Sequence, residues 1–230
     1  MKLDKSMSFR ATTLRQRLTG VILLAMMGSP VFGQAKDSPI VFANQDAITA
    51  TLVKPTSMSS GPSAGSSSSF SNGDNQWLKV EFHYGVVPQK TDWVDEVEFK
   101  VWVEGRDLLD PAGQPGQGIA VGLTGSVTYV NLAKAKDAYG VFYVHPSTLA
   151  RYSTDRGGVN DFTRTFDVHV EAYVNGQLVD AVDKNKETDI QWYQKLKAVP
   201  GLVYRQNQCV FLMIDADKYP AIKLPTDAAK

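Results

Sequence analysis

Apolar residues recur at every second position in three segments of this chain, and this alternation constrains the fold more than any other feature of the sequence. Successive side chains of a β-strand point to opposite faces of the sheet, so such alternation indicates strands with one buried and one solvated face. The segments are 78–84, 97–103 and 166–172. Strands of this kind are typical of antiparallel sheets, and the sequence therefore predicts an all-β fold.

Turn residues and β-branched runs extend the prediction along the chain. Asn175 and Gly176 separate two alternating segments and predict a hairpin, because both residues tolerate a positive φ. A β-branched run over 47–53 predicts a first strand upstream of the main body. About seven strands are expected after it, at 77–85, 94–104, 119–132, 139–145, 164–174, 178–183 and 208–214.

Two short helices are expected in the connections. One follows Pro146, with Ser147 or Thr148 as its cap, and the other runs from residue 188 or 189 to 196. Short alternating strands joined by turns favour an Ig-like, Greek-key β-sandwich. An eight-stranded up-and-down barrel is the alternative, and the uneven connections favour the sandwich over it.

The first 35 residues are typical of a secretory signal peptide. Five Lys and Arg residues precede an apolar stretch at 21–27, and small residues follow it at 33–35. That apolar stretch is shorter than a membrane-spanning helix requires, so we expect cleavage rather than retention as an anchor. The protein is therefore expected to be exported, to the periplasm, the outer-membrane surface or the extracellular space.

A Ser- and Gly-rich tract over 55–75 separates the first strand from the main body. Its composition cannot bury enough apolar surface to offset the entropy of ordering, so a flexible loop or linker is expected there. The predicted organisation is a signal peptide at 1–35, an N-terminal strand with this tract at 36–75, a sandwich domain at 76–223 and a tail at 224–230.

Charge and cysteine content exclude several classes of partner and stabiliser. The whole chain has 24 basic and 24 acidic residues, and removal of the signal leaves 19 against 23. A mildly acidic mature protein argues against binding to nucleic acid or to anionic lipid. Cys209 is the one cysteine, so no intrachain disulfide can form and stability must come from the core.

The histidines permit a zinc hypothesis, which we set against a simpler one. His83 and Glu81 share the outward face of one predicted strand, and His169 and Glu171 share that of another. If the two strands were neighbours, these groups could approach tetrahedral ligation of zinc. A solvated polar face explains the same residues and is favoured, so no metal and no cofactor are expected.

Catalytic signatures are missing from the sequence. The serines of 57–71 lack a nucleophile elbow, and the glycines of 113–118 lack the lysine of a phosphate-binding loop. Carboxylates cluster over 92–98, at 107 and 110, and at 215 and 217, without the spacing of a calcium loop. We therefore expect a protein that is not an enzyme.

Aromatic residues at outward positions are the better candidates for function. Trp102 and Tyr173 lie on the polar faces of their strands, and Trp93 lies at a loop. Outward aromatic side chains anchor many protein interfaces, because they combine a large apolar area with a polar handle. The alternative for Trp102 is burial beneath a connection, and it is the favoured one.

Several motifs together resemble a known family. They are the strand opening at 77–82, the segments 125–132 and 141–146, the residues 149–152, and the ending at 215–222. Their order is similar to that of a family of small exported Ig-like proteins from Verrucomicrobia, which are associated with type IV pilus-like gene clusters. The resemblance covers residues 75–223 and implies an Ig-like sandwich with a non-enzymatic role at the cell envelope.

Function is therefore expected to lie in binding. The expected partner is an envelope or pilus-assembly protein, held at a sheet edge or at the exposed aromatic residues Trp102, Tyr173 and Trp93. Two alternatives stay open at this point: a glycan-binding or glycan-processing module, and a self-assembling surface or filament subunit that forms a homo-oligomer.

Overall fold

The computed structural model describes residues 38–43, 45–55, 76–110, 112–113, 118–154, 157–185, 191–215 and 217–224. The chain divides into two units, 1–33 and 34–230, and every described residue lies in the second. Three predicted segments lie outside the described residues: the signal peptide, most of the Ser-rich tract, and all but the first residue of the tail at 224–230. No described helix is both long and apolar enough to cross a membrane.

The first sheet, which we call sheet A, has β3 and β6 at its centre. β1 and β2 lie end to end along one edge of β3, and β10 pairs with the far edge of β6. All pairings in sheet A are antiparallel. Its strands are β1 (Ile40–Phe42), β2 (Ile48–Val53), β3 (Trp77–Val86), β6 (Ala135–Val144) and β10 (Val203–Arg205).

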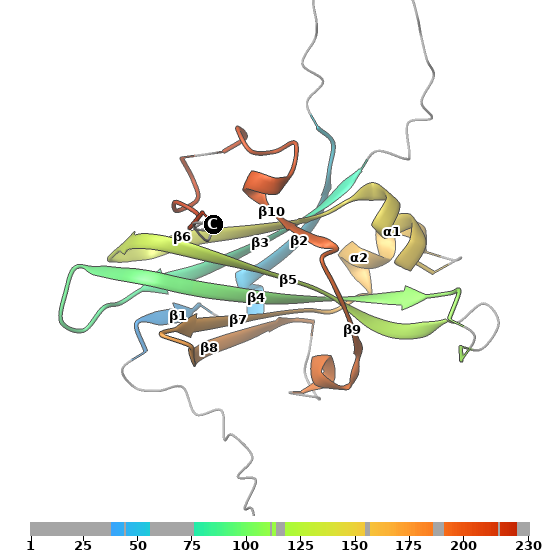
Figure 1. Ribbon diagram of the computed structural model, residues 1–230, viewed down its shortest axis with the longest axis horizontal. Helices are drawn as coiled ribbons and strands as arrows, with labels where there is room; N and C mark the ends of the chain where they lie inside the picture. Colours follow the sequence, from blue (N-terminus) through green and yellow to red (C-terminus); the bar gives the residue numbers. More distant parts are fainter. Residues whose placement is uncertain are drawn as a thin grey trace, which may run out of the picture. The chain divides into compact units, whose positions relative to one another are not determined.

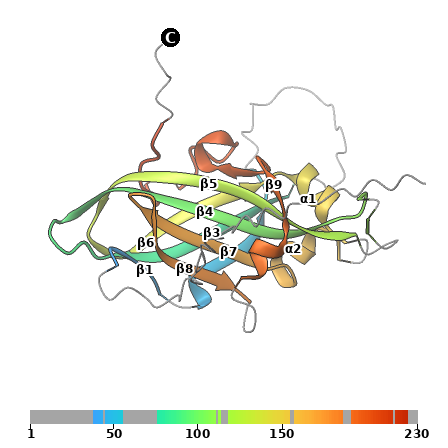
Figure 2. The same ribbon diagram turned by 60° about the horizontal axis from the view of Figure 1, so that its bottom comes forward.

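The second sheet, sheet B, has the order β8-β7-β4-β5-β9. The hairpin of β4 and β5, two strands of 15 residues each, forms its long axis (Figure 2). β9 is the exception in this sheet, because it runs parallel to β5. The strands are β4 (Trp93–Asp107), β5 (Ile119–Ala133), β7 (Val168–Val174), β8 (Gln177–Lys184) and β9 (Lys197–Pro200).

The connections are of the Greek-key kind. After the β4–β5 hairpin the chain crosses to sheet A as β6, and then returns to sheet B as β7, which pairs with β4. Two short helices, α1 (Pro146–Tyr152) and α2 (Asp161–Arg164), lie together in that return (Figure 1). The predicted all-β sandwich with short helices in its connections is confirmed, and the barrel alternative is wrong.

The core forms where the inward side chains of the two sheets meet. Phe82 of sheet A packs on Phe99 of sheet B with ring centroids 4.8 Å apart, and both side chains are fully buried. Gly140 lies directly beneath the Phe82 ring, where a Cβ would come within 2.0 Å of a ring carbon. The alternation therefore buries one face of each sheet, and a glycine makes room for the inward ring of Phe82.

Several predicted elements differ from the structure. The strand predicted at 208–214 is not formed. Gln208 ends the 3-10 helix η4 (Gln206–Gln208), and 209–214 form turns, because their apolar run does not alternate. The strand predicted from 164 begins at 168, since α2 occupies its first residue. His145, rather than Ser147 or Thr148, caps α1 by accepting a hydrogen bond from the Ser147 backbone amide at 3.1 Å.

The other differences are short elements that sequence patterns do not reveal. β1, β9 and β10 have three or four residues each and form only because longer strands lie beside them. Of the second predicted helix, residues 192–195 form a 3-10 helix, η3 (Trp192–Lys195), and 186–190 lie outside the described residues. The Asn175–Gly176 hairpin is present, with both residues at positive φ.

Two buried tyrosines allow a test of the core. The hydroxyl of Tyr84 has no hydrogen-bond partner among the described residues, whereas that of Tyr129 accepts the Val141 amide proton at 3.1 Å. A buried polar group without a partner is destabilising, and removal of a partner is costly. We expect Tyr84→Phe to raise the free energy of unfolding by about 1 kcal/mol and Tyr129→Phe to lower it by about 1–2 kcal/mol. Urea unfolding of both variants measures this, and equal effects would contradict it.

Candidate functional site

The outward faces of the two sheets carry different polar clusters. His83 and Glu81 lie on β3 in sheet A, whereas His169 and Glu171 lie on β7 in sheet B. These outward faces are on opposite sides of the sandwich, so the four residues do not come together. The shared zinc site that we weighed is therefore not formed, and no group of three or more metal-ligating residues occurs among the described residues.

His169 is at the centre of the cluster on sheet B. Its side chain is buried, with 2% of its surface exposed, although it lies on the outward face of β7. The Nδ1 atom lies 2.9 Å from Asp183 Oδ1 on β8, and Nε2 lies 3.5 Å from Glu171 Oε1. The second contact is an ion pair rather than a hydrogen bond, because its geometry leaves Nε2 without a hydrogen-bond acceptor.

The segment 191–200, which we call the strap, covers this cluster. The Tyr193 ring stacks on His169 with centroids 3.8 Å apart, and its hydroxyl donates to Glu171 Oε1 at 2.7 Å. The indole Nε1 of Trp192 donates to Asp183 Oδ1, also at 2.7 Å. Both side chains of η3 are thus held by the two carboxylates that flank His169.

Electrostatic shifts follow from this arrangement. Burial lowers the pKa of His169, but its contacts with Asp183 and Glu171 outweigh burial, so that the pKa is raised above 6.5. Burial raises the pKa of Glu171, and the contacts with His169, Tyr173 and Tyr193 lower it below its ordinary value. The cluster therefore favours the protonated form of the imidazole, which lies between two carboxylates.

The three predicted partner-binding aromatics lie in different environments. Trp102 is half-buried, because Tyr193 of the strap packs on it with centroids 4.9 Å apart. Tyr173 is half-buried too, donates to Glu171 Oε2 at 2.6 Å and carries the Lys100 ammonium 4.1 Å above its ring. Trp93 is 53% exposed, at the start of β4. The structure does not gather these aromatic side chains into one surface.

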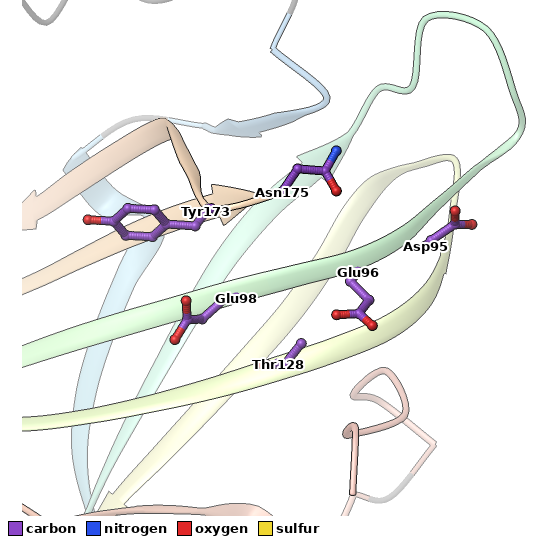
Figure 3. A pocket seen from close by; sticks show the side chains of 7 residues that line it. Asp95, Glu96, Glu98, Thr128, Tyr173 and Asn175 are labelled. Atoms are coloured by element: carbon purple, nitrogen blue, oxygen red, sulfur yellow. The ribbon is translucent and has the colours of Figure 1, made fainter. Parts of the chain in front are cut away.

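A hollow of about 470 Å³ lies beside Tyr173 (Figure 3). Its lining is mostly polar and acidic, and it includes neither Trp93 nor Trp102. Lys223 forms an ion pair with Glu96, and Lys100 lies 3.8 Å from Glu98, so part of its negative charge is already compensated. The lining residues are Asp95, Glu96, Glu98, Thr128, Tyr173, Asn175 and Gly176.

The outward face of sheet A is covered by the C-terminal segment. Phe211 is buried there and stacks on Tyr143 of β6 at 4.6 Å, with an angle of 8° between the rings. Glu81 of β3 accepts hydrogen bonds from Lys218 at 2.8 Å and from the Tyr219 hydroxyl, and pairs with Lys79. Burial alone would raise the pKa of Glu81. The three partners outweigh burial and lower the pKa from 4.5 to about 2.

The turn at 209–214, which we call the apolar turn, presents apolar side chains to solvent. Val210, Leu212 and Met213 are 61%, 50% and 78% exposed, on either side of the buried Phe211. The turn is ordered by Gln206, whose Nε2 donates to the Ile214 carbonyl at 2.7 Å. Sequence reasoning missed this surface because it assigned 208–214 to a half-buried strand. The signal was present as a continuous apolar run, which does not fit alternation.

These features define an all-β sandwich whose outward faces are covered by segments of its own chain. A protein-family model whose description reads “-like” matches residues 41–226, and the chain belongs to that family. A crystal structure of a protein from Akkermansia muciniphila, a verrucomicrobium, is similar, with a TM-score of 0.53 and 20% sequence identity. The match covers 77% of this chain and 94% of that one and shows a shared fold. No curated protein matches this chain.

Alanine substitutions separate a structural from a recognition role for the tryptophans. We expect Trp102→Ala to lower the free energy of unfolding by about 2–3 kcal/mol, because it removes the support of Tyr193 and His169. Trp93→Ala is expected to cost less than about 1 kcal/mol, since half of that side chain is already in water. Chemical denaturation measures both, and equal losses would contradict the assignment.

Acid should weaken the attachment of the C-terminal segment. The pKa of Glu81 is about 2 in the folded state against 4.5 in a free side chain, so its stabilisation is present above about pH 4.5 and lost as pH falls towards 2. We expect wild-type stability to decline over that window by about 2 kcal/mol more than that of Glu81→Gln. Asp95→Asn is the control and should follow the wild type. Parallel pH profiles for Glu81→Gln and wild type would refute this.

Proposed function

We propose that this chain is an exported, non-enzymatic binding protein of the cell envelope that acts in type IV pilus-like assembly by holding a partner protein. The observation that carries the proposal is the apolar turn, where Val210, Leu212 and Met213 are exposed on a backbone that is already ordered. Exposed apolar groups in such a cluster are costly in water and mark sites of protein association.

The order of the apolar turn supports binding rather than chance exposure. The amide protons of Leu212 and Ile214 bond to the carbonyls of Cys209 and Phe211 at 3.3 and 3.0 Å, and Phe211 anchors the turn to sheet A. A surface that is ordered before binding loses little conformational entropy when it binds. The expected partner surface is an apolar recess of another envelope protein, which would bury these three side chains.

The chemistry of the described residues also favours binding over catalysis. The most buried polar groups on the outward faces, His169 and Glu171, are covered by the strap, whose Tyr193 stacks on the imidazole and donates to the carboxylate. The pilus-like role is supported by the resemblance of residues 75–223 to the family of exported Ig-like proteins, and export is supported by the signal-like residues 1–35.

Substitutions in the apolar turn test the proposal. We expect the double variant Leu212→Asp and Met213→Asp to weaken partner binding at least tenfold, because two hot-spot side chains become charged. The effect on folding should be small, since Leu212 is half exposed and Met213 is mostly exposed. The measurement is capture from the native envelope fraction with quantitative mass spectrometry, followed by a Kd with the purified partner.

Leu109→Asp is the matched control, because Leu109 is a similarly exposed apolar residue in a different turn. It should retain the wild-type Kd. The proposal fails if the control and the double variant bind alike, or if the mature protein forms filaments by itself at micromolar concentration.

A further inference from the structure

The strap is attached to sheet B by the pairing of β9, by an ion pair, and by the packing and hydrogen bonds of η3. β9 contributes four residues paired in parallel with β5, and Lys197 reaches Asp110 with an ion pair of 3.2 Å. In η3, Trp192 and Tyr193 are both buried, and their side chains donate to the carboxylates of Asp183 and Glu171. A segment held in this way can open without unfolding of the two sheets.

We propose that protonated His169 is the latch of this strap, which stays closed near neutral pH and is released as pH rises and the imidazole loses its proton. Among the described residues, His169 contacts Tyr193 and both of the carboxylates to which the η3 side chains donate. It stacks on Tyr193, bonds to the carboxylate that holds Trp192, and pairs with the carboxylate that holds Tyr193.

Charge balance gives the physical reason for the latch. With His169 protonated, one positive charge lies between the carboxylates of Glu171 and Asp183, which are largely withdrawn from water. When the proton leaves, the two carboxylates remain beneath the strap on either side of a neutral imidazole, without a cation between them. Opening of the strap lets water solvate them, and the stacking of an imidazolium on the Tyr193 ring is also lost.

Other charged groups lie on the elements packed around His169. Lys100 is paired opposite Glu171 on β4, and Glu104 flanks Trp102 on the far side from Lys100. Asp167 precedes β7, and Lys195 belongs to η3. These two acids and two bases balance one another, so the buried trio of His169, Glu171 and Asp183 decides the response.

The direction of the effect follows from linkage. Pairing with the carboxylates raises the pKa of His169 above the 6.5 of a free side chain. A raised pKa in the folded state means that the stabilisation is complete below about pH 6.5 and is lost as pH rises through the raised value. The closed strap is therefore favoured below the raised pKa of His169, and opening belongs to the pH range above it.

Opening has a defined structural consequence. β9 occupies the edge of β5 at residues 121–124, while the side chain of Arg205 and the chain at 221–223 occupy the same edge further along. Release of the strap would expose four residues of unpaired backbone and the face of Trp102. An exposed edge of this kind can accept a strand from another protein.

Proteolysis measures the latch directly. Lys195 and Lys197 are exposed in the strap, and a lysine-specific protease cleaves after them when the strap opens. The rate of cleavage in the strap is measured from pH 6.5 to 9 on the whole protein. It is divided by the rate of cleavage of a free peptide of residues 191–200, which corrects for the pH dependence of the protease itself. We expect this ratio to rise by up to about tenfold for each pH unit above the midpoint, with the same midpoint as the NMR titration of His169.

Two variants complete the experiment. His169→Gln should be cleaved rapidly at all pH values, and His83→Gln, a histidine on the opposite face, should behave as wild type. The inference is overturned if the wild-type ratio does not change with pH, if its midpoint differs from that of His169, or if His169 stays protonated through pH 9. The wild-type titration decides the matter even if His169→Gln does not fold.

Discussion

Exclusion of water between two facing sheets is the constraint on which the rest of this structure depends. Aromatic rings make the contact, with Phe82 and Tyr84 of sheet A each packed 4.8 Å from Phe99 of sheet B. Because side chains alternate along a strand, the choice of these inward residues also fixes the outward ones, and a slip of one residue would reverse the two faces. The polar and aromatic residues of the outward faces therefore follow from the core.

Each outward face is covered in the same manner by a segment outside the long strands. On sheet B, Tyr193 of the strap stacks on a sheet residue and donates its hydroxyl to Glu171. On sheet A, Phe211 stacks on Tyr143, and Tyr219 donates its hydroxyl to Glu81. In both places a tyrosine hydroxyl satisfies a partly buried carboxylate, and in both the attachment depends on the protonation of charged groups rather than on apolar area alone.

These two covers explain why the protein is expected to bind rather than to catalyse. They fill the faces where a sequence-based search had placed histidines and carboxylates, and those groups are used to attach the covers. Apolar surface is then presented by one of the covers, at the apolar turn, rather than by Trp102 or Tyr173. Membership of the family and the fold shared with the Akkermansia muciniphila protein give the architecture alone, so the proposed role depends on the surface segments.

Alternation in the sequence determined the all-β class, the long strands β3 to β8 and the Asn175–Gly176 hairpin, because all of these are set by neighbours within a few residues. Tertiary structure alone decided that Tyr193 lies on His169 and that Lys218 reaches Glu81 across 137 positions of the chain. Those outcomes depend on which strands are adjacent and on what covers them. Such long-range pairings leave no periodic trace in the segments concerned, so they become visible only when the sheets are assembled.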